Sequence, residues 1–456
     1  MHILPKLHYW WQAKRSSFWF VPTLIVLDAV VLATLLITLD ATVELHVVER
    51  WPLLFGAGAD GARGLLTAVA SSMITVAGAV FSITLVALAL TSSQYTSRVI
   101  RNFMRDRVNQ AVLGVFVGIF AYCLVVLRTI RGGDEGGFVP TLAVLGGLIL
   151  AFVGIAVLIY FIHYVSTSIQ ASRIIAAAAQ ETLAAVDQLF PETLGDHADD
   201  DNKANLARAL AMQAWVAVPA ERTGYIETVD ADALLGVARA HGTILRMDRG
   251  IGDFVVAGTP LVSAVDPGDL DDTITAELNA PYVVSRQRTV EQDVAFGIRQ
   301  IVDIAMKALS PGVNDTTTAV MCVDYLTAIL VRLAPRRIAA AHWPDQGKLH
   351  VIARGPSFAG LVSESFDQIR QNAGGNVAVL LRMLGALETI ATRTLSPDRR
   401  RVLGQTVEEI AEAAERTIDA PHDRARLGNR LTRVREVLAT APVVFVRAHQ
   451  DGLEVR

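Results

Sequence analysis

Cysteine is scarce in this sequence, and the placement of the two cysteines excludes two kinds of site. Cys123 stands inside an apolar run and Cys322 inside a helical pattern. They form no C-x-x-C pair and offer no zinc-ligand spacing, so the sequence excludes both a disulfide framework and a zinc centre. Lysine is scarce too, and arginine carries almost all of the positive charge.

Charge is also low, and its distribution divides the chain. Charged residues make up 19% of the 456 residues, whereas soluble domains have about 25%. The mean hydropathy is +0.40, and nearly all of the apolar excess lies before residue 165. The formal net charge of −4 argues against nucleic acid as the main partner. The composition therefore predicts an N-terminal membrane part followed by a soluble part.

Four apolar segments are long enough to cross a bilayer, whose hydrocarbon core requires about 20 residues of helix. The segments are 18–39, 66–91, 109–128 and 139–164. The first is as long as a full span and no A-x-A cleavage site follows it, which argues against a signal peptide. Trp10, Trp11 and Trp19 stand where an aromatic belt would anchor this helix.

Arginine and lysine in the short flanking segments set the orientation of these spans. The N-terminal segment 1–17 carries Lys6, Lys14 and Arg15, and the 92–108 loop is rich in arginine. The 40–65 loop is more acidic than basic. Both termini are therefore predicted to face the cytoplasm, with a large cytoplasmic domain after the fourth span.

An aspartate, Asp28, lies near the middle of the first predicted span. An ionisable group at that depth is costly unless it is paired or protonated, so it is a candidate functional residue. The alternative is a protonated aspartate that shares hydrogen bonds with hydroxyl groups of a neighbouring helix.

Small and hydroxyl residues recur along the second predicted span, at Thr67, Ser71, Thr75, Gly78 and Ser82. Spacings of three and four place them on one helical stripe. The stripe fits a polar cavity or pore that several subunits build, and it also fits close helix packing. Gln94, Arg98 and Arg101 are candidates for a cytoplasmic mouth, where arginines would concentrate anions.

The region after the spans divides into five predicted parts. They are a helical stalk at 165–190, a polar linker at 191–214, a β-rich module at 215–285, a helical hairpin at 286–335 and a mostly helical region at 336–456. Within the last region, a strand at 348–354 precedes helices at 358–373, 376–395, 397–418 and 422–440. The predicted fold class is an α-helical membrane protein with four transmembrane helices and a large α+β cytoplasmic domain.

The β-rich module contains GDFVVAGTPL at 252–261, which resembles the Gly-Asp turn of biotinyl and lipoyl barrel-sandwich domains. Glycine permits the tight hairpins of such a module. No lysine occurs between Lys203 and Lys307. A lipoyl or biotin amide link is therefore excluded, and the module is predicted to be a scaffold of barrel-sandwich shape.

The hairpin contains a joint in the stretch ALSPGVNDTTTAV, at residues 308–320, where one helical pattern stops and another begins. Its residues are Ser310, Pro311, Gly312, Asn314 and Asp315. Asn314 or Asp315 is a natural N-cap for the second helix. An anion site at that helix N-terminus is the alternative. Asp315 would repel an anion, which favours a purely structural joint.

Catalytic motifs are absent from the sequence. It has no P-loop, no H-E-x-x-H, no G-x-S-x-G and no recognisable nucleophile–base spacing. We therefore predict neither an enzyme nor a bound cofactor.

Two segments carry a family resemblance: SSQYTSRVIRNFMRD at 92–106 and RTVEQDVAFGIRQIVDIAMKALSPGVNDTTTA at 288–319. Together with the four spans, they resemble the bacterial predicted-membrane-protein family called domain of unknown function 2254. Arg288, Gln292 and Asp293 fit the family pattern. The chain departs from it at Thr96-Ser97-Arg98, where the family tends to have Ser-Pro-Arg, and at Asp315-Thr316, where it often has Asp-Pro. The resemblance implies an integral membrane protein and brings no assigned activity.

Two functions remain open from the sequence. The first is a homo-oligomeric channel with a regulatory cytoplasmic domain, whose partners are the lipid bilayer, copies of itself and an ion. The second is a membrane-anchored scaffold or sensor that binds a partner or small ligand through its cytoplasmic domain. A transporter is disfavoured, because the sequence shows neither internal repeats nor broken helices.

Overall fold

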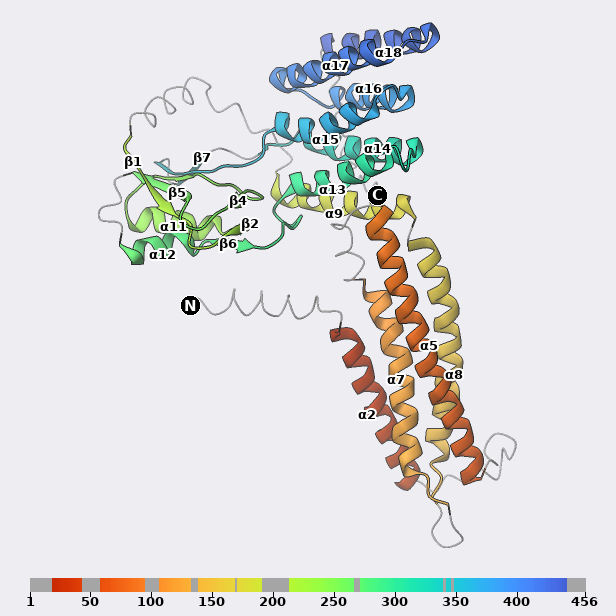
Figure 1. Cartoon of the computed structure of the whole chain (residues 1–456). Helices are drawn as coiled ribbons and strands as arrows, with labels where there is room; N and C mark the ends of the chain where they lie inside the picture. The colour runs from red at the N-terminus through yellow and green to blue at the C-terminus, as the bar shows by residue number, and fades with distance from the viewer. Residues whose placement is uncertain are drawn as a thin grey trace, which may run out of the picture. The chain divides into compact units, whose positions relative to one another are not determined.

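The computed structural model describes residues 19–42, 58–94, 106–132, 138–168, 170–190, 213–265, 271–338, 342–345 and 348–440. They belong to two compact units, Met1–Arg173 and Ile174–Arg456 (Figure 1). Each unit has its own core and is described separately.

The first unit contains four long helices that correspond to the four predicted spans. They are α2 (Phe20–Thr42), α5 (Ala59–Gln94), α7 (Arg107–Thr129) and α8 (Thr141–Ser168). Helix α7 is the most buried of them and packs against the other three. Its buried side chains Phe116, Ile119, Tyr122 and Val126 form the centre of the core.

Glycines in α7 and α8 allow these helices to approach their neighbours closely. A Cβ added at Gly114 of α7 would lie 2.9 Å from the Cα of Pro22, and one added at Gly154 of α8 would lie 2.9 Å from Sδ of Met73. Neither site could therefore hold a larger side chain without movement. The small residues of these two helices serve packing within the chain, as is common between membrane helices.

The same glycine contacts show the directions of the helices. Gly114 faces Pro22 and Ile25 whereas Gly118 faces Ile25 and Ala29, so α2 and α7 run in the same direction. Helices α5 and α8 also run in the same direction, because Gly147 faces Leu66 and Gly154 faces Met73. The chain therefore alternates in direction along α2, α5, α7 and α8.

The predicted helical stalk at 165–190 falls on two helices of the structure. Helix α8 ends at Ser168, and α9 (Ala171–Leu189) begins after an interruption. The hydroxyls of Ser166, Thr167 and Ser168 donate to carbonyls of the last turns of α8. Such bonds are local and also occur within the continuous helices α2 and α5. The predicted linker at 191–214 lies almost entirely outside the described residues.

Two sheets lie in the second unit, in the orders β1-β5-β3-β8-β7 and β4-β2-β6. The strands are β1 (Trp215–Pro219), β2 (Gly224–Val229), β3 (Leu245–Met247), β4 (Phe254–Val255), β5 (Pro260–Val265), β6 (Tyr282–Ser285), β7 (His342–Asp345) and β8 (Lys348–Ile352). All pairs are antiparallel except β3 and β8, where Leu245 is opposite Val351. Two helices, α11 (Ala231–Ala240) and α12 (Asp272–Asn279), connect strands of the module.

The β module therefore differs from the predicted barrel-sandwich confined to 215–285. Strands β7 and β8 come from beyond the helical hairpin and complete the larger sheet. The glycine-rich turn is present, since Gly252 and Gly258 have φ of +85° and +83°. Glycine adopts this left-handed conformation without a steric penalty.

Six helices of the second unit stack in two layers (Figure 1). They are α13 (Val294–Ala308), α14 (Thr316–Leu333), α15 (Phe358–Ala373), α16 (Val377–Ala391), α17 (Pro397–Thr417) and α18 (Pro421–Ala439). Each packs against the helix two positions along the chain, so α13, α15 and α17 form one layer and α14, α16 and α18 the other. Stacked helix pairs of this kind are typical of α-solenoids.

Candidate functional site

The described part of the chain has five helices that are long and apolar enough to cross a membrane. Four are α2, α5, α7 and α8 of the first unit, and the fifth is α14 of the second. Helix α14 packs against α13 and α16, with Ala319, Leu326 and Leu330 fully buried. Four spans are expected from the sequence, and α14 falls within the predicted helical hairpin at 286–335.

Helix α5 has two opposite faces that differ in chemistry. The face turned to the core buries Ala62, Leu66, Ala70, Met73, Ala77, Val80 and Ala87. On the other face, the predicted stripe residues are all exposed; they are Thr67, Ser71, Thr75, Gly78 and Ser82. Packing within the chain therefore does not explain why this stripe is small and polar.

Glycines on the outward face of α5 have open space beside them. A Cβ added at Gly64 or Gly78 would meet no atom within 4 Å, in contrast to the close contacts at Gly114 and Gly154. Beside these two glycines, a helix from outside the chain could therefore approach the α5 backbone closely.

Half of the stripe hydroxyls have partners on their own helix. Thr75 Oγ1 donates to the carbonyl of Ser71 at 2.8 Å, and Ser82 Oγ donates to that of Gly78 at 2.9 Å. The hydroxyls of Thr67 and Ser71 have no hydrogen-bond partner among the described residues. These two groups could donate to a partner outside the chain.

The two aspartates of α2 also differ in their hydrogen-bond partners within the chain. Asp40 accepts hydrogen bonds from the backbone N–H groups of Leu142 and Ala143, both at 3.2 Å, so it caps the first turn of α8. Asp28 is exposed on the outer side of α2. Asp40 is therefore part of the fold of one chain, whereas the fold makes no visible use of Asp28.

Asp28 and the α5 stripe lie at about the same depth along the bundle. Ala29, the neighbour of Asp28, faces Gly118 of α7, and the next α7 residue, Ile119, meets Gly154 together with Met73 of α5. Ser71 and Thr75 flank Met73 on the outward side. The structure thus shows an exposed carboxyl and exposed hydroxyls at one level on two helices.

The other candidate residues near the membrane are only partly described. Gln94 is the last residue of α5, and its side chain is not among those described. Arg98 and Arg101 lie outside the described residues, so the predicted cytoplasmic mouth stays a prediction.

The helix joint at 310–315 satisfies its own polar groups. Asn314 adopts φ of +49°, and the N–H of Asp315 donates to the carbonyl of Ala308 at 2.8 Å. As N-cap of α14, Asp315 accepts from the backbone N–H of Thr318 at 3.0 Å and from its hydroxyl at 2.6 Å. These hydrogen bonds lower the pKa of Asp315. A charged carboxylate thus occupies the helix N-terminus where the alternative anion site would lie.

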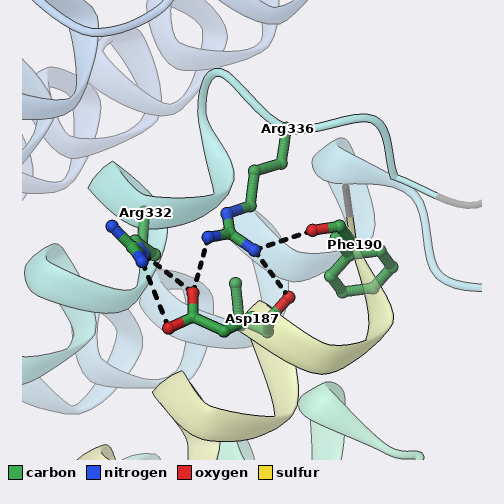
Figure 2. A network of polar contacts seen from close by, with 5 residues as sticks. Asp187, Phe190, Arg332 and Arg336 are labelled. Carbon is green, nitrogen blue, oxygen red and sulfur yellow. Dashed lines mark hydrogen bonds and ion pairs between the residues drawn. The ribbon is translucent and has the colours of Figure 1, made fainter. Parts of the chain in front are cut away.

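A polar network fastens the end of α9 to the end of α14 (Figure 2). Asp187 accepts hydrogen bonds from Nε and Nη2 of Arg332, at 2.8 and 3.1 Å, and from Nη2 of Arg336 at 2.6 Å. Nη1 of Arg336 donates to the carbonyls of Val186 and Phe190, at 3.0 and 2.7 Å. Arg336 is buried. Its two hydrogen bonds satisfy carbonyls that have no intrahelical partner at the C-terminus of a helix.

Sequence reasoning missed this network. Asp187 and Arg336 are 149 positions apart, and neither belongs to a recognisable motif. The doublet Arg336-Arg337 after a helical pattern was the one available signal, since cations favour helix C-termini. Among the described residues, no group of three or more His, Cys, Asp and Glu residues could hold a metal ion.

Comparisons with known proteins agree with the resemblance found in the sequence. The family described as "Predicted membrane protein (DUF2254)" matches residues 15–389. Uncharacterized proteins of Mycobacterium bovis and Mycobacterium tuberculosis are 36% identical over 393 residues, covering 85% of this chain and 74% of theirs. No solved structure matches the chain. The match extends from the first membrane helix through α16, and the chain belongs to the predicted-membrane-protein family DUF2254.

Proposed function

We propose that the chain is a subunit of a homo-oligomeric, channel-like protein of the bacterial cytoplasmic membrane, with a regulatory cytoplasmic domain. The observation that carries the proposal is the outward position of the α5 stripe, opposite the face that packs within the chain. The proposal contains no catalytic step.

In this proposal α2, α5, α7 and α8 are the membrane spans, and α14 is not. The alternating directions of the four helices put the start of α2 and the end of α8 at the same end of the bundle, which supports a cytoplasmic position for both termini. The excess of arginine and lysine on that side favours the cytoplasm. Helix α14 carries Asp324 and Arg332, which pair with Arg382 and Asp187 of neighbouring helices, as expected for a helix in a soluble domain.

The exposed polar groups support assembly from several copies. A carboxyl or hydroxyl group turned towards lipid loses its hydrogen bonds to water, and a carboxyl is especially costly. Copies related by rotation about the membrane normal keep every residue at its own depth. Because Asp28 and Ser71 share a depth, a neighbouring copy can place its α2 carboxyl beside the α5 hydroxyls of the first.

Such an arrangement encloses a polar cavity between copies. Asp28 provides a titratable oxygen ligand, and Thr67, Ser71 and Thr75 provide hydroxyls along the wall. We include Arg98 and Arg101 as the cytoplasmic mouth, where their charges would attract anions. Four helices alone form too small a bundle to enclose a water-filled pathway, so conduction requires the oligomer.

Cysteine substitution tests the proposal directly, because the two native cysteines, Cys123 and Cys322, are both buried. We expect Ser71→Cys in proteoliposomes to react with a charged, water-soluble methanethiosulfonate reagent and the reaction to change ion flux. The control is Phe152→Cys on α8, whose side chain is 65% exposed yet should face lipid and stay unreactive.

The oligomer is tested separately by a disulfide between copies. The variant that combines Asp28→Cys with Ser71→Cys should form a disulfide-linked ladder of oligomers on mild oxidation, and either single variant should not. Wild-type protein that passes no ions at any voltage, with Ser71→Cys unreactive and no ladder, would contradict the proposal.

A membrane-anchored sensor is the second candidate function. It is favoured by a groove in the second unit that is lined by Arg246, Arg354 and Arg399 and has the size of a small-molecule site. The two functions are separated by ion flux: a sensor without a channel binds its ligand and conducts nothing.

A further inference from the structure

An open groove lies in the second unit where the β module meets the helical stack. Its volume is about 540 Å³, within the range of about 300–1,000 Å³ that is usual for ligand sites. Three arginines line it, Arg246 of β3, Arg354 after β8 and Arg399 of α17, and none of the described residues that line it is acidic. The wall of the groove is therefore positively charged.

Of the three groove arginines, Arg399 is the one with no carboxylate partner among the described residues. Its Nη1 donates to the carbonyls of Leu333 and Ala334, at 3.3 and 2.8 Å, and its guanidinium lies 5.0 Å from the ring centre of Phe358. Partial burial lowers the pKa of Arg399. Its Nε and Nη2 have no hydrogen-bond partner in the described part of the chain, and a cation held away from water attracts an anion more strongly.

The other two arginines have partners that an anion can replace. Arg246 pairs with Asp248 at 3.1 Å, and Arg354 pairs with Asp253 at 3.4 Å. Their side chains are 40% and 57% exposed. Ion pairs this exposed contribute little to stability, so a ligand anion can replace the carboxylates at small cost. Other contacts keep the guanidinium groups in place: Arg246 lies 4.5 Å from the ring centre of Trp215, and Arg354 donates to the carbonyl of Asp248 at 3.0 Å.

The start of α15 adds a second source of positive potential. Ser357 and Phe358 line the groove, and Ser357 is the N-cap of this 16-residue helix. Its first turn contains no acidic residue. Backbone N–H groups at such a helix start favour bound anions.

The remaining wall is apolar. Met247, Ile338, Ile352 and Phe358 lie along it. Met247 and Phe358 are already buried, whereas Ile338 and Ile352 are partly exposed. A simple inorganic anion would leave the two isoleucines uncovered, whereas a ligand with an apolar or aromatic body would cover them.

We propose that this groove binds a small phosphorylated molecule with an aromatic or apolar body, of the nucleotide class. Arg246, Arg354 and Arg399 contact the phosphate groups together with the first turn of α15, and the body lies against Phe358 and Ile352. The inference concerns the second unit alone and does not depend on whether the protein conducts ions.

A fluorescent ATP analogue, mant-ATP, tests the site on the full-length protein in detergent. We expect saturable binding that inorganic pyrophosphate displaces and adenosine displaces poorly. Arg354→Gln and Arg399→Gln should each weaken binding by about tenfold or more, the usual effect of losing a hydrogen bond to a charged group. The control Arg401→Gln removes a charge on α17 that is 79% exposed and outside the groove, and binding should not change.

Because Arg399 also holds two carbonyls, circular dichroism must show that Arg399→Gln folds. If it does not fold, Arg246→Gln and Arg354→Gln decide the question. The proposal is overturned if mant-ATP and pyrophosphate both fail to bind at up to about 1 mM, a weak limit for a specific site. It is also overturned if Arg246→Gln and Arg354→Gln bind as well as the wild type.

Discussion

Substitutions at Asp187, Arg336 and Arg332 test which of the two arginines stabilises the contact between α9 and α14. Both arginines donate to Asp187, but their surroundings differ. The side chain of Arg336 is 3% exposed and that of Arg332 is 41% exposed. Arg336 also donates to carbonyls at the end of α9, those of Val186 and Phe190. We expect Arg336 to contribute most of the stability.

The expected magnitudes follow from exposure. A hydrogen bond to a charged group contributes about 1.5–3 kcal/mol, and solvent screening reduces this at Asp187, whose side chain is 46% exposed. Asp187→Asn should therefore lower the free energy of local opening of α9 by about 1–2 kcal/mol. Arg336→Met should lower it by about 2–4 kcal/mol because buried carbonyls lose their donor. Arg332→Met should lower it by about 1 kcal/mol or less.

Amide hydrogen exchange of α9 in the full-length protein measures these differences. A loss of about 1–2 kcal/mol corresponds to exchange that is about 5–30 times faster. The order Arg336→Met, Asp187→Asn, Arg332→Met is the essential result, from the largest effect to the smallest. Equal effects of the two arginine variants would refute the reasoning from burial.

The same carboxylate predicts a dependence on pH. The hydrogen bond from Arg332 holds the pKa of Asp187 below its ordinary value of 3.8. A carboxylate whose pKa is lowered by folding contributes stability above its ordinary value and loses it as the pH falls through the folded pKa. The difference between wild type and Asp187→Asn should therefore persist from neutral pH down to about pH 5 and disappear well below pH 3.8.

Substitutions at three further positions test other parts of the structure. Gly154→Leu should destabilise the detergent-solubilised first unit by about 1–3 kcal/mol in thermal unfolding because it displaces Met73. Gly78→Leu should leave that transition nearly unchanged and reduce oligomers in native mass spectrometry; equal losses of stability would contradict the outward position of Gly78. Asp315→Ala should cost about 1 kcal/mol in exchange of the first turn of α14, and Asp315→Asn clearly less, since asparagine can still cap the helix.

Local signals made the helices of the second unit predictable. The expected segment 358–373 matches α15, and 397–418 and 422–440 match α17 and α18 within a residue or two. Ser357 and Ser396 cap the first two of these helices, and Pro421 opens the third. Caps and helix-start prolines act within one turn, so they can be read without tertiary contacts.

Features that depend on distant parts of the chain were not predictable in the same way. The periodicity of Ser71 and Thr75 identifies a stripe, but only the contacts of α7 and α8 show that it faces outward. The groove gathers arginines from β3, the loop after β8, and α17, which no local pattern connects.

The pairing of β3 with β8 has a consequence for synthesis of the chain. Roughly 100 residues lie between these strands, which takes about 5–20 s to translate at typical rates. During that time β3 has β5 on one edge and nothing on the other, while α13 and α14 emerge from the ribosome. An open strand edge invites pairing with other chains. A nascent or truncated chain that stops short of Lys348 should therefore be prone to aggregation or held by chaperones.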